Sequence, residues 1–123
     1  AAAPLQEAAI VALGFPDAYY DKLAADYRER RDTLLPVLAE AGFRIHEPDG
    51  AYYVMTDIAG LTSDDDVTFA RRLIHDPGVA GVPGSSFFSR PELGRTKVRF
   101  AFPKRLETLR AASERLARLA TPA

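Results

Sequence analysis

The chain has 123 residues, the length of one ordinary domain, and 47% of them are apolar. Its 16 Lys and Arg residues against 17 Asp and Glu residues leave a net charge of −1. This balance argues against binding dominated by phosphate neutralisation, as on nucleic acid or an anionic membrane. The absence of cysteine excludes disulfides and thiol redox chemistry. Apolar runs are too short to cross a membrane and the first residues lack a signal-peptide pattern, so a cytoplasmic location is expected.

Two helices are predicted at the start of the chain. Apolar residues at a spacing of four predict a helix from Pro4 to Leu13, and Gly14-Phe15-Pro16-Asp17 interrupts the pattern. A long amphipathic helix follows from about Asp17 to Ala41, where apolar residues recur at intervals of three and four. Pro36 should kink this helix, because its ring and missing donor disturb the preceding turn. Gly42 suits the left-handed residue that ends it.

A hairpin and a third helix come next. Strands are predicted over Phe43 to Glu47 and Ala51 to Thr56, joined by Pro48-Asp49-Gly50, in which proline sets the first corner and glycine tolerates a positive φ. Ser63 as a cap and the acids 64–66 in a solvated first turn predict the start of a helix. The buried stripe of that helix is expected to be Val67, Ala70, Leu73 and Ile74.

The last third of the chain predicts two strands and one helix. After Asp76-Pro77-Gly78 ends the third helix, a short strand is predicted from Val79 to Val82, running into the Pro83-Gly84-Ser85-Ser86 loop. A further strand covers Val98 to Phe102, and an amphipathic helix covers Leu106 to Leu119. This order of elements predicts an α+β fold with helices packed on one face of a small sheet.

One strand carries a candidate binding residue. Alternation from Thr96 to Phe102 places Val98, Phe100 and Phe102 beneath the helices and Lys97, Arg99 and Ala101 on the opposite face. A guanidinium on a rigid strand, with room above it beside the small Ala101, can receive a carboxylate through two parallel charge-assisted hydrogen bonds. The pattern alone leaves open an ordinary solvent-facing arginine, because such arginines are common.

Other candidate sites have weaker patterns. The loop at residues 83–86 lacks the Gly-Lys-Ser/Thr ending of a phosphate-binding loop. Neither His46 nor His75 has a partner at metal-ligand spacing, so no metal site is predicted. Of Tyr52 and Tyr53, which alternate on a strand, one is expected in the core and the other outside it.

Several segments together carry a family resemblance. Gly50-Ala51-Tyr52-Tyr53, Val82-Pro83-Gly84-Ser85-Ser86-Phe87 and Val98-Arg99-Phe100-Ala101-Phe102 occur in this order, after Pro4-Leu5-Gln6-Glu7-Ala8 and Tyr27-Arg28-Glu29-Arg30-Arg31-Asp32. This set resembles the C-terminal third of class I/II (fold-type I) pyridoxal-phosphate-dependent aminotransferases over nearly the whole chain. The resemblance implies that residues 15–123 are a C-terminal small domain that begins with a long interdomain helix. Residues 1–14 would be a remnant of the large domain or a linker helix.

The resemblance also implies which part of the parent enzyme binds the substrate and which part binds the cofactor. Arg99 would bind the α-carboxylate of amino acid and 2-oxo acid substrates, Phe87 and Phe88 would border the substrate entrance or else anchor their turn in the core, and the large domain of the same chain would bind pyridoxal phosphate. That chemistry needs a Schiff-base lysine in a desolvated pocket, and the three lysines of this chain lack such surroundings. The chain is therefore expected to be inactive alone, as part of a parent enzyme that is a homodimer.

Two further readings stay open from the sequence. One is a stand-alone α+β module that binds carboxylates or regulates another protein. The other is the same domain of a pyridoxal-phosphate-dependent lyase or synthase, with the same arginine. Met55 is the only methionine and the chain opens directly into a helical pattern, which suits either a fragment or a processed N-terminus.

Overall fold

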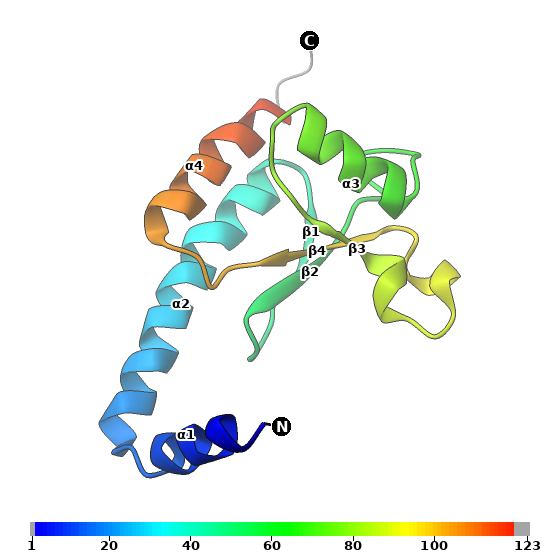
Figure 1. Ribbon diagram of the computed structural model, residues 1–123. Coiled ribbons are helices and arrows are strands. Elements are labelled where there is room, and N and C mark those ends of the chain that lie inside the picture. Colours follow the sequence, from blue (N-terminus) through cyan, green and yellow to red (C-terminus); the bar gives the residue numbers. More distant parts are fainter. Residues whose placement is uncertain (1, 120–123) are drawn as a thin grey trace.

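The computed structural model describes residues 2–119 and has four α-helices and four strands (Figure 1). The helices are α1 (Ala3–Leu13), α2 (Asp17–Glu40), α3 (Asp66–His75) and α4 (Leu106–Leu116). The strands are β1 (Arg44–His46), β2 (Tyr53–Asp57), β3 (Val82–Pro83) and β4 (Lys97–Ala101), and short 3-10 helices cover Gly84–Phe87 (η1), Pro91–Gly94 (η2) and Ala117–Leu119 (η3). The structure confirms the predicted α+β class and the order of its elements.

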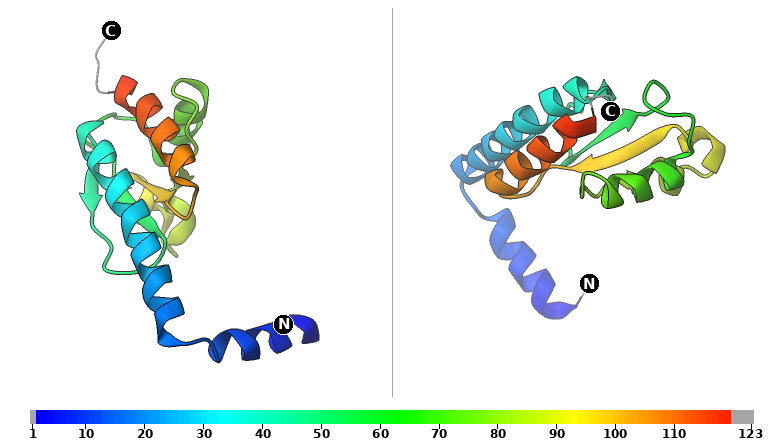
Figure 2. Two further views of the ribbon diagram at one scale, coloured as in Figure 1. Left: turned by 90° about the vertical axis from the view of Figure 1, so that its left-hand side faces the viewer. Right: turned by 90° about the horizontal axis from the view of Figure 1, so that it is seen from above.

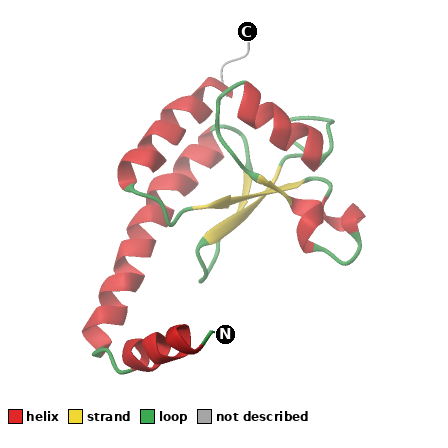
Figure 3. Cartoon of the chain, viewed as in Figure 1, coloured by secondary structure: helices red, strands yellow, loops and turns green. Residues whose placement is uncertain are grey.

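The four strands form one antiparallel sheet in the order β1-β2-β4-β3 (Figure 3). β4 lies between β2 and β3, and Arg99 pairs with Met55 on one side and with Val82 on the other. Directly paired residues of antiparallel strands share a face. The register therefore fixes which side chains surround Arg99.

The core lies between the sheet and helices α2, α3 and α4. These helices contribute Leu34, Leu38, Phe69, Leu73, Leu109 and Leu116, which pack on Val54, Val98 and Phe100 of the strands. Figures 1 and 2 show the three helices gathered on the same side of the sheet, with α2 and α4 side by side. The prediction that helices cover one face is confirmed, and within residues 2–119 no α-helix lies over the opposite face, which carries Arg99.

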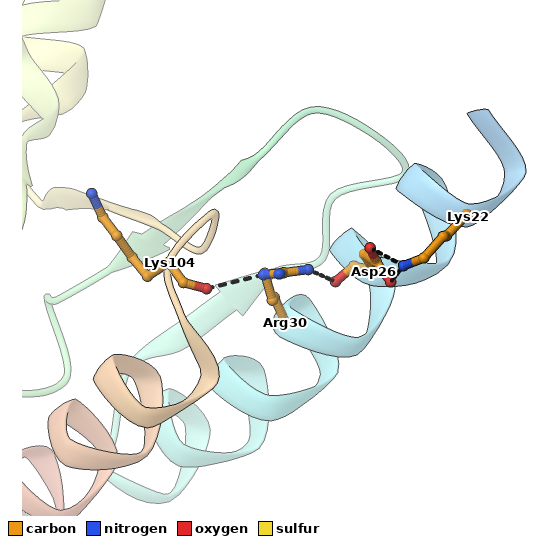
Figure 4. A network of polar contacts seen from close by, with 4 residues as sticks. All are labelled: Lys22, Asp26, Arg30 and Lys104. Atoms are coloured by element: carbon orange, nitrogen blue, oxygen red, sulfur yellow. Dashed lines mark hydrogen bonds and ion pairs between the residues drawn. The ribbon is translucent and has the colours of Figure 1, made fainter. Parts of the chain in front are cut away.

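A polar contact fastens α2 to the segment that enters α4. The guanidinium of Arg30 donates from Nε to the carbonyl of Lys104 at 2.9 Å and from Nη1 to the carbonyl of Asp26 at 2.6 Å (Figure 4). Lys22 pairs with Asp26 one turn earlier. This contact marks the point beyond which the first half of α2 extends past the sheet.

The first helix packs against almost nothing. α1 buries none of its residues, and Figures 1 and 2 show it attached to the far end of α2, away from the sheet. Its large apolar side chains are exposed to solvent: the exposed fraction is 62% for Val11, 64% for Ile10, 66% for Leu5 and 82% for Leu13. The hydroxyl of Tyr20 donates to the carbonyl of Ala12 across the break between the helices. None of the helices in residues 2–119 is long and apolar enough to span a membrane.

The prediction for the start of α3 was wrong in two respects. Asp65, not Ser63, is the capping residue, because its carboxylate accepts from the backbone N–H of Thr68 at 2.8 Å. The inward stripe is Asp66, Phe69, Ala70 and Leu73, so Val67 and Ile74 of the predicted stripe are exposed. Ala70 and Leu73 of the predicted stripe are confirmed; the prediction missed Asp66 and Phe69, because the true stripe begins with a charged residue.

Turn positions were predicted with mixed success. Gly42 has φ = +93°, which confirms its role in ending α2. In the hairpin loop the positive φ belongs to Ala51, at +64°, and not to Gly50. Pro36 lies within α2, which continues past it to Glu40.

Candidate functional site

Arg99 lies on the sheet face that the helices leave open. Val98, Phe100 and Phe102 are buried, whereas Lys97 and Arg99 are half-buried and Ala101 is exposed. The alternation predicted along this strand is therefore confirmed. A rigid central strand holds the Cα of Arg99 in place, so that only the side chain needs positioning.

Two aromatic rings position that side chain. The guanidinium carbon of Arg99 lies 4.8 Å from the ring centroid of Tyr53 and 4.1 Å from that of Phe87. Stacking on rings covers the faces of a guanidinium and leaves its edge N–H groups free to donate. The sequence pattern predicts open space above Arg99, and aromatic side chains partly fill that space.

The Arg99 guanidinium has an unsatisfied donor. Its Nε is the one buried side-chain nitrogen or oxygen within residues 2–119 that has no hydrogen-bond partner. Across the same residues, no carboxylate forms an ion pair with Arg99. A buried donor left unpaired is costly, so this nitrogen is suited to an external acceptor such as a carboxylate.

The neighbouring cation on the same face is already neutralised. Lys97 donates to Asp57 at 3.3 Å, and the same carboxylate accepts from the hydroxyl of Thr96 at 3.2 Å and from the backbone N–H of Ala59 at 2.8 Å. Burial alone would raise the pKa of Asp57, but the hydrogen bonds from Ala59, Lys97 and Thr96 outweigh it and hold that pKa below its ordinary value. Arg99 is therefore the cation of this strand that remains available to an anion.

The ring of Phe87 is brought over Arg99 by the short helix η1. The carboxylate of Asp66, which is 2% exposed, accepts from the backbone N–H of Ser85 at 2.7 Å and so ties η1 to the start of α3. This contact also occupies the amide that a phosphate would use in the loop at residues 83–86. Asp66 was not found from the sequence, where it was grouped with its neighbours as a solvated helix start.

The aromatic residues of the site were only partly predicted. Neither Tyr52 nor Tyr53 is in the core: Tyr52 is exposed, and Tyr53 is half-buried against Arg99. Phe87 is 43% exposed and Phe88 is half-buried, so the reading in which both anchor their turn in the core is wrong. The sequence left Phe87 either at a substrate entrance or in the core, and it did not predict the contact of this ring with Arg99.

Two surface cavities lie away from Arg99. One, of about 490 Å³, is bounded by α4, residues 78–80 and Phe100, and the other, of about 340 Å³, lies between the first half of α2 and residues 48–51. Both have mainly apolar walls. No three His, Cys, Asp or Glu side chains within residues 2–119 lie close enough together to hold a metal ion.

Comparison with known proteins identifies the family. Residues 2–116 match the family described as aminotransferase class I and II. The chain belongs to the class I and II aminotransferases. This family depends on pyridoxal phosphate.

Individual aminotransferases match over almost all of this chain. The probable N-succinyldiaminopimelate aminotransferase of Mycobacterium tuberculosis is 38% identical over 96% of the chain, which corresponds to 32% of that relative. The methionine aminotransferase of Escherichia coli is 36% identical over 82% of the chain and 26% of its own length. The chain thus spans about a third or less of the curated aminotransferases it matches.

Solved aminotransferase structures share the fold. The N-succinyldiaminopimelate aminotransferase of Mycobacterium tuberculosis superposes with a TM-score of 0.84 and 39% identity, covering 96% of this chain and 31% of that one. The aspartate aminotransferase of Thermus thermophilus with maleate gives a TM-score of 0.71 at 36% identity, over 84% of this chain and 25% of that one.

The lysines of this aminotransferase chain do not fit the role of the cofactor's Schiff-base partner. Lys22 is 75% exposed and pairs with Asp26, and Lys104 is exposed at the entrance to α4 (Figure 4). Lys97 is held by Asp57. A nucleophilic lysine needs a desolvated pocket, whereas two of these amines are exposed and the third is held in an ion pair.

Proposed function

We propose that this chain is the C-terminal small domain of a pyridoxal-phosphate-dependent aminotransferase, and that Arg99 supplies its receptor for the substrate α-carboxylate. Residues 15–123 would form that domain, with residues 1–14 as a linker helix or a remnant of the large domain; residues 1 and 120–123 lie outside the described part. The parent would act on amino acids and 2-oxo acids as a homodimer. The observation that carries the proposal is the guanidinium of Arg99, which lies over the rings of Tyr53 and Phe87 and whose buried Nε has no partner within residues 2–119.

The arrangement suits a carboxylate better than other anions. The planar fork of a guanidinium matches the two oxygens of a carboxylate, and each charge-assisted hydrogen bond is stronger than a neutral one. The guanidinium lies over the rings of Tyr53 and Phe87, so its N–H groups are the part that can still donate to a ligand. A substrate held at its carboxylate has its Cα fixed, which is the positioning that a reaction at Cα requires.

The rest of the parent protein would supply the cofactor and its lysine. We assign no step of amino-group transfer to residues of this chain, whose role is to bind and orient the substrate. The proposal is supported by the family membership and by the maleate in the related Thermus thermophilus structure, because maleate is a dicarboxylate.

The test is Arg99→Ala in the full-length parent enzyme. Losing one partner of a buried charge pair costs about 2–5 kcal/mol, so kcat/KM for amino acids should fall at least about thirtyfold. Arg99→Lys should restore only part of this, because a point charge cannot reproduce the fork. An amine substrate without a carboxylate should be nearly indifferent to both changes.

A matched control is Arg44→Ala, which removes an exposed arginine from the same face of the sheet, two strands away on the edge strand β1. It should leave kcat/KM within about twofold. If Arg99→Ala keeps amino acid turnover within twofold of the parent at full cofactor occupancy, Arg99 is an ordinary surface arginine and the proposal is rejected. Product analysis with the same protein separates an aminotransferase from a lyase or synthase.

A further inference from the structure

Three consecutive acids at the start of α3 have three different partners. Asp64 pairs with Arg72 at 2.7 Å on the surface, and Asp65 caps the helix through the N–H of Thr68. Asp66 is buried and reaches neither of these groups; its carboxylate accepts from the backbone N–H of Ser85 at 2.7 Å. Because the cap and the surface pair are already made by its neighbours, helix formation does not account for the burial of Asp66.

The contact of Asp66 joins three segments at one point. Its backbone N–H donates to the carbonyl of Arg95, two residues before β4, at 2.9 Å. Its side chain holds Ser85 in η1. The start of α3 therefore adds a hydrogen bond at Ser85 to the other contacts that hold η1 beside β4, namely the pairing of β3 with β4 and the packing of Gly84 on Lys97.

Phe87 depends on this fixation. Its ring lies 4.1 Å from the guanidinium of Arg99 but is itself 43% exposed, so core packing does not hold it. Phe87 lies two residues after Ser85 in the same short helix. The position of the ring over Arg99 therefore follows from the position of η1.

We propose that Asp66 is a positioning residue for the carboxylate site: by holding the N–H of Ser85 it keeps the Phe87 ring over the Arg99 guanidinium. This inference rests on the proposed function of Arg99. Loosening η1 at Ser85 would let the ring of Phe87 shift, and the guanidinium would then lose one of the two aromatic contacts that restrict it. Carboxylate binding would weaken although every group that touches the carboxylate is still present.

The experiment compares Asp66→Ala with Asp65→Ala in the full-length holoenzyme. Asp65→Ala removes the cap of the same helix and leaves the Ser85 contact intact, so it controls for destabilisation of α3. Asp66→Ala should raise KM for amino acids about tenfold, the effect of one hydrogen bond to a charged group, while kcat changes less than twofold. Asp65→Ala should change neither constant by more than twofold.

Three further measurements separate positioning from general damage. An amine substrate without a carboxylate should show an unchanged KM with Asp66→Ala. The dissociation constant of succinate, measured by calorimetry, should rise about tenfold, as a readout independent of turnover. Asp66→Asn, which keeps one acceptor oxygen for Ser85, should recover most of the loss.

A double mutant tests whether the effect passes through Arg99. On an Arg99→Ala background, Asp66→Ala should cause no further loss, because the group that it positions is gone. Additive losses, or equal losses with the carboxylate-free amine, would overturn the inference. If Asp66→Ala does not fold, Phe87→Leu replaces it: that variant must show the same carboxylate-specific rise in KM, and an unchanged KM would overturn the inference.

The inference and the proposed function fail differently. A large effect of Arg99→Ala combined with no effect of Asp66→Ala or Phe87→Leu rejects only the positioning role. An absent effect of Arg99→Ala rejects the function itself.

Discussion

At the scale of single residues, the environment of Arg99 differs from that of a solvated arginine. Two rings cover its faces, an arrangement that contributes about 0.5–2 kcal/mol and restricts rotation of the side chain. The strand pattern was enough to predict the face on which Arg99 lies. It could not predict Tyr53 and Phe87 as partners, because those contacts depend on the pairing of β2 with β4 and on the path of η1.

Asp57 provides a test at the same scale. Its carboxylate accepts three hydrogen bonds in the folded protein, and its pKa is below the ordinary value of 3.8. A lowered pKa in the folded state means that the carboxylate stabilises the protein above about pH 4, and that this contribution disappears as the pH falls through the folded pKa. Asp57→Asn should thus cost about 1 kcal/mol at pH 7 and progressively less below pH 4, in urea unfolding measured from pH 7 to pH 2.

The control for this pH series is Asp21→Asn, an exposed aspartate on α2. Its difference from the unmodified protein should stay small throughout. A cost of Asp57→Asn that did not shrink on acidification would show that the hydrogen bonds of Asp57 do not depend on its charge.

At the scale of elements, every α-helix and strand was expected, but the short helices η1 and η2 were not. α3 was predicted from its acidic start and its periodicity, and of its predicted inward stripe Ala70 and Leu73 are buried whereas Val67 and Ile74 are exposed. Burial of Asp66 is tolerated only because Ser85 supplies a hydrogen bond. Because Ser85 is distant from Asp66 in the sequence, the local sequence pattern around Asp66 could not predict this hydrogen bond. The same limit applies to β3, whose two residues are defined only by pairing with β4.

The contact between η1 and β4 makes a prediction for this scale. A Cβ on Gly84 would lie 2.6 Å from the Cβ and carbonyl oxygen of Lys97 and 2.7 Å from the carbonyl oxygen of Gly94. Two of these are backbone atoms that cannot move aside without shifting the strand or η2. Gly84→Ala should therefore destabilise the protein by about 1–3 kcal/mol in urea unfolding.

Gly60→Ala is the matched control, since a Cβ there meets nothing within 4 Å. It should stay within about 0.5 kcal/mol of the parent. Equal free energies of unfolding for the two variants would contradict the close contact between η1 and β4.

At the scale of the whole molecule, the apolar surface is unevenly distributed. α1 and the start of α2 form an exposed apolar arm, made of Leu5, Ile10, Val11, Leu13, Phe15, Tyr19, Tyr20 and Leu23. Exposed apolar patches of this kind mark surfaces that another part of a protein or a partner normally covers. The sequence predicted the two helices of this arm, but periodicity within them could not show that the rest of residues 2–119 leaves every residue of α1 unburied.

Deleting residues 1–14 tests this arm. Because α1 buries none of its residues, the free energy of unfolding of the remaining chain should change by less than about 0.5 kcal/mol. Self-association, measured by sedimentation over a range of concentrations, should decrease because four of the eight exposed apolar side chains of the arm are gone. A deletion that lowered the unfolding free energy by several kcal/mol would show instead that α1 packs on the core.

The pairing of β2 with β4 has a practical consequence. It sets Met55 directly across from Arg99, and the sequence contains no other methionine. Labelling methionine methyl groups would thus give one NMR signal from this part of the protein, that of Met55 on the strand next to Arg99. In the whole parent enzyme, once the signals of its other methionines are assigned, the Met55 signal would report ligand binding at Arg99 without any substitution in the site.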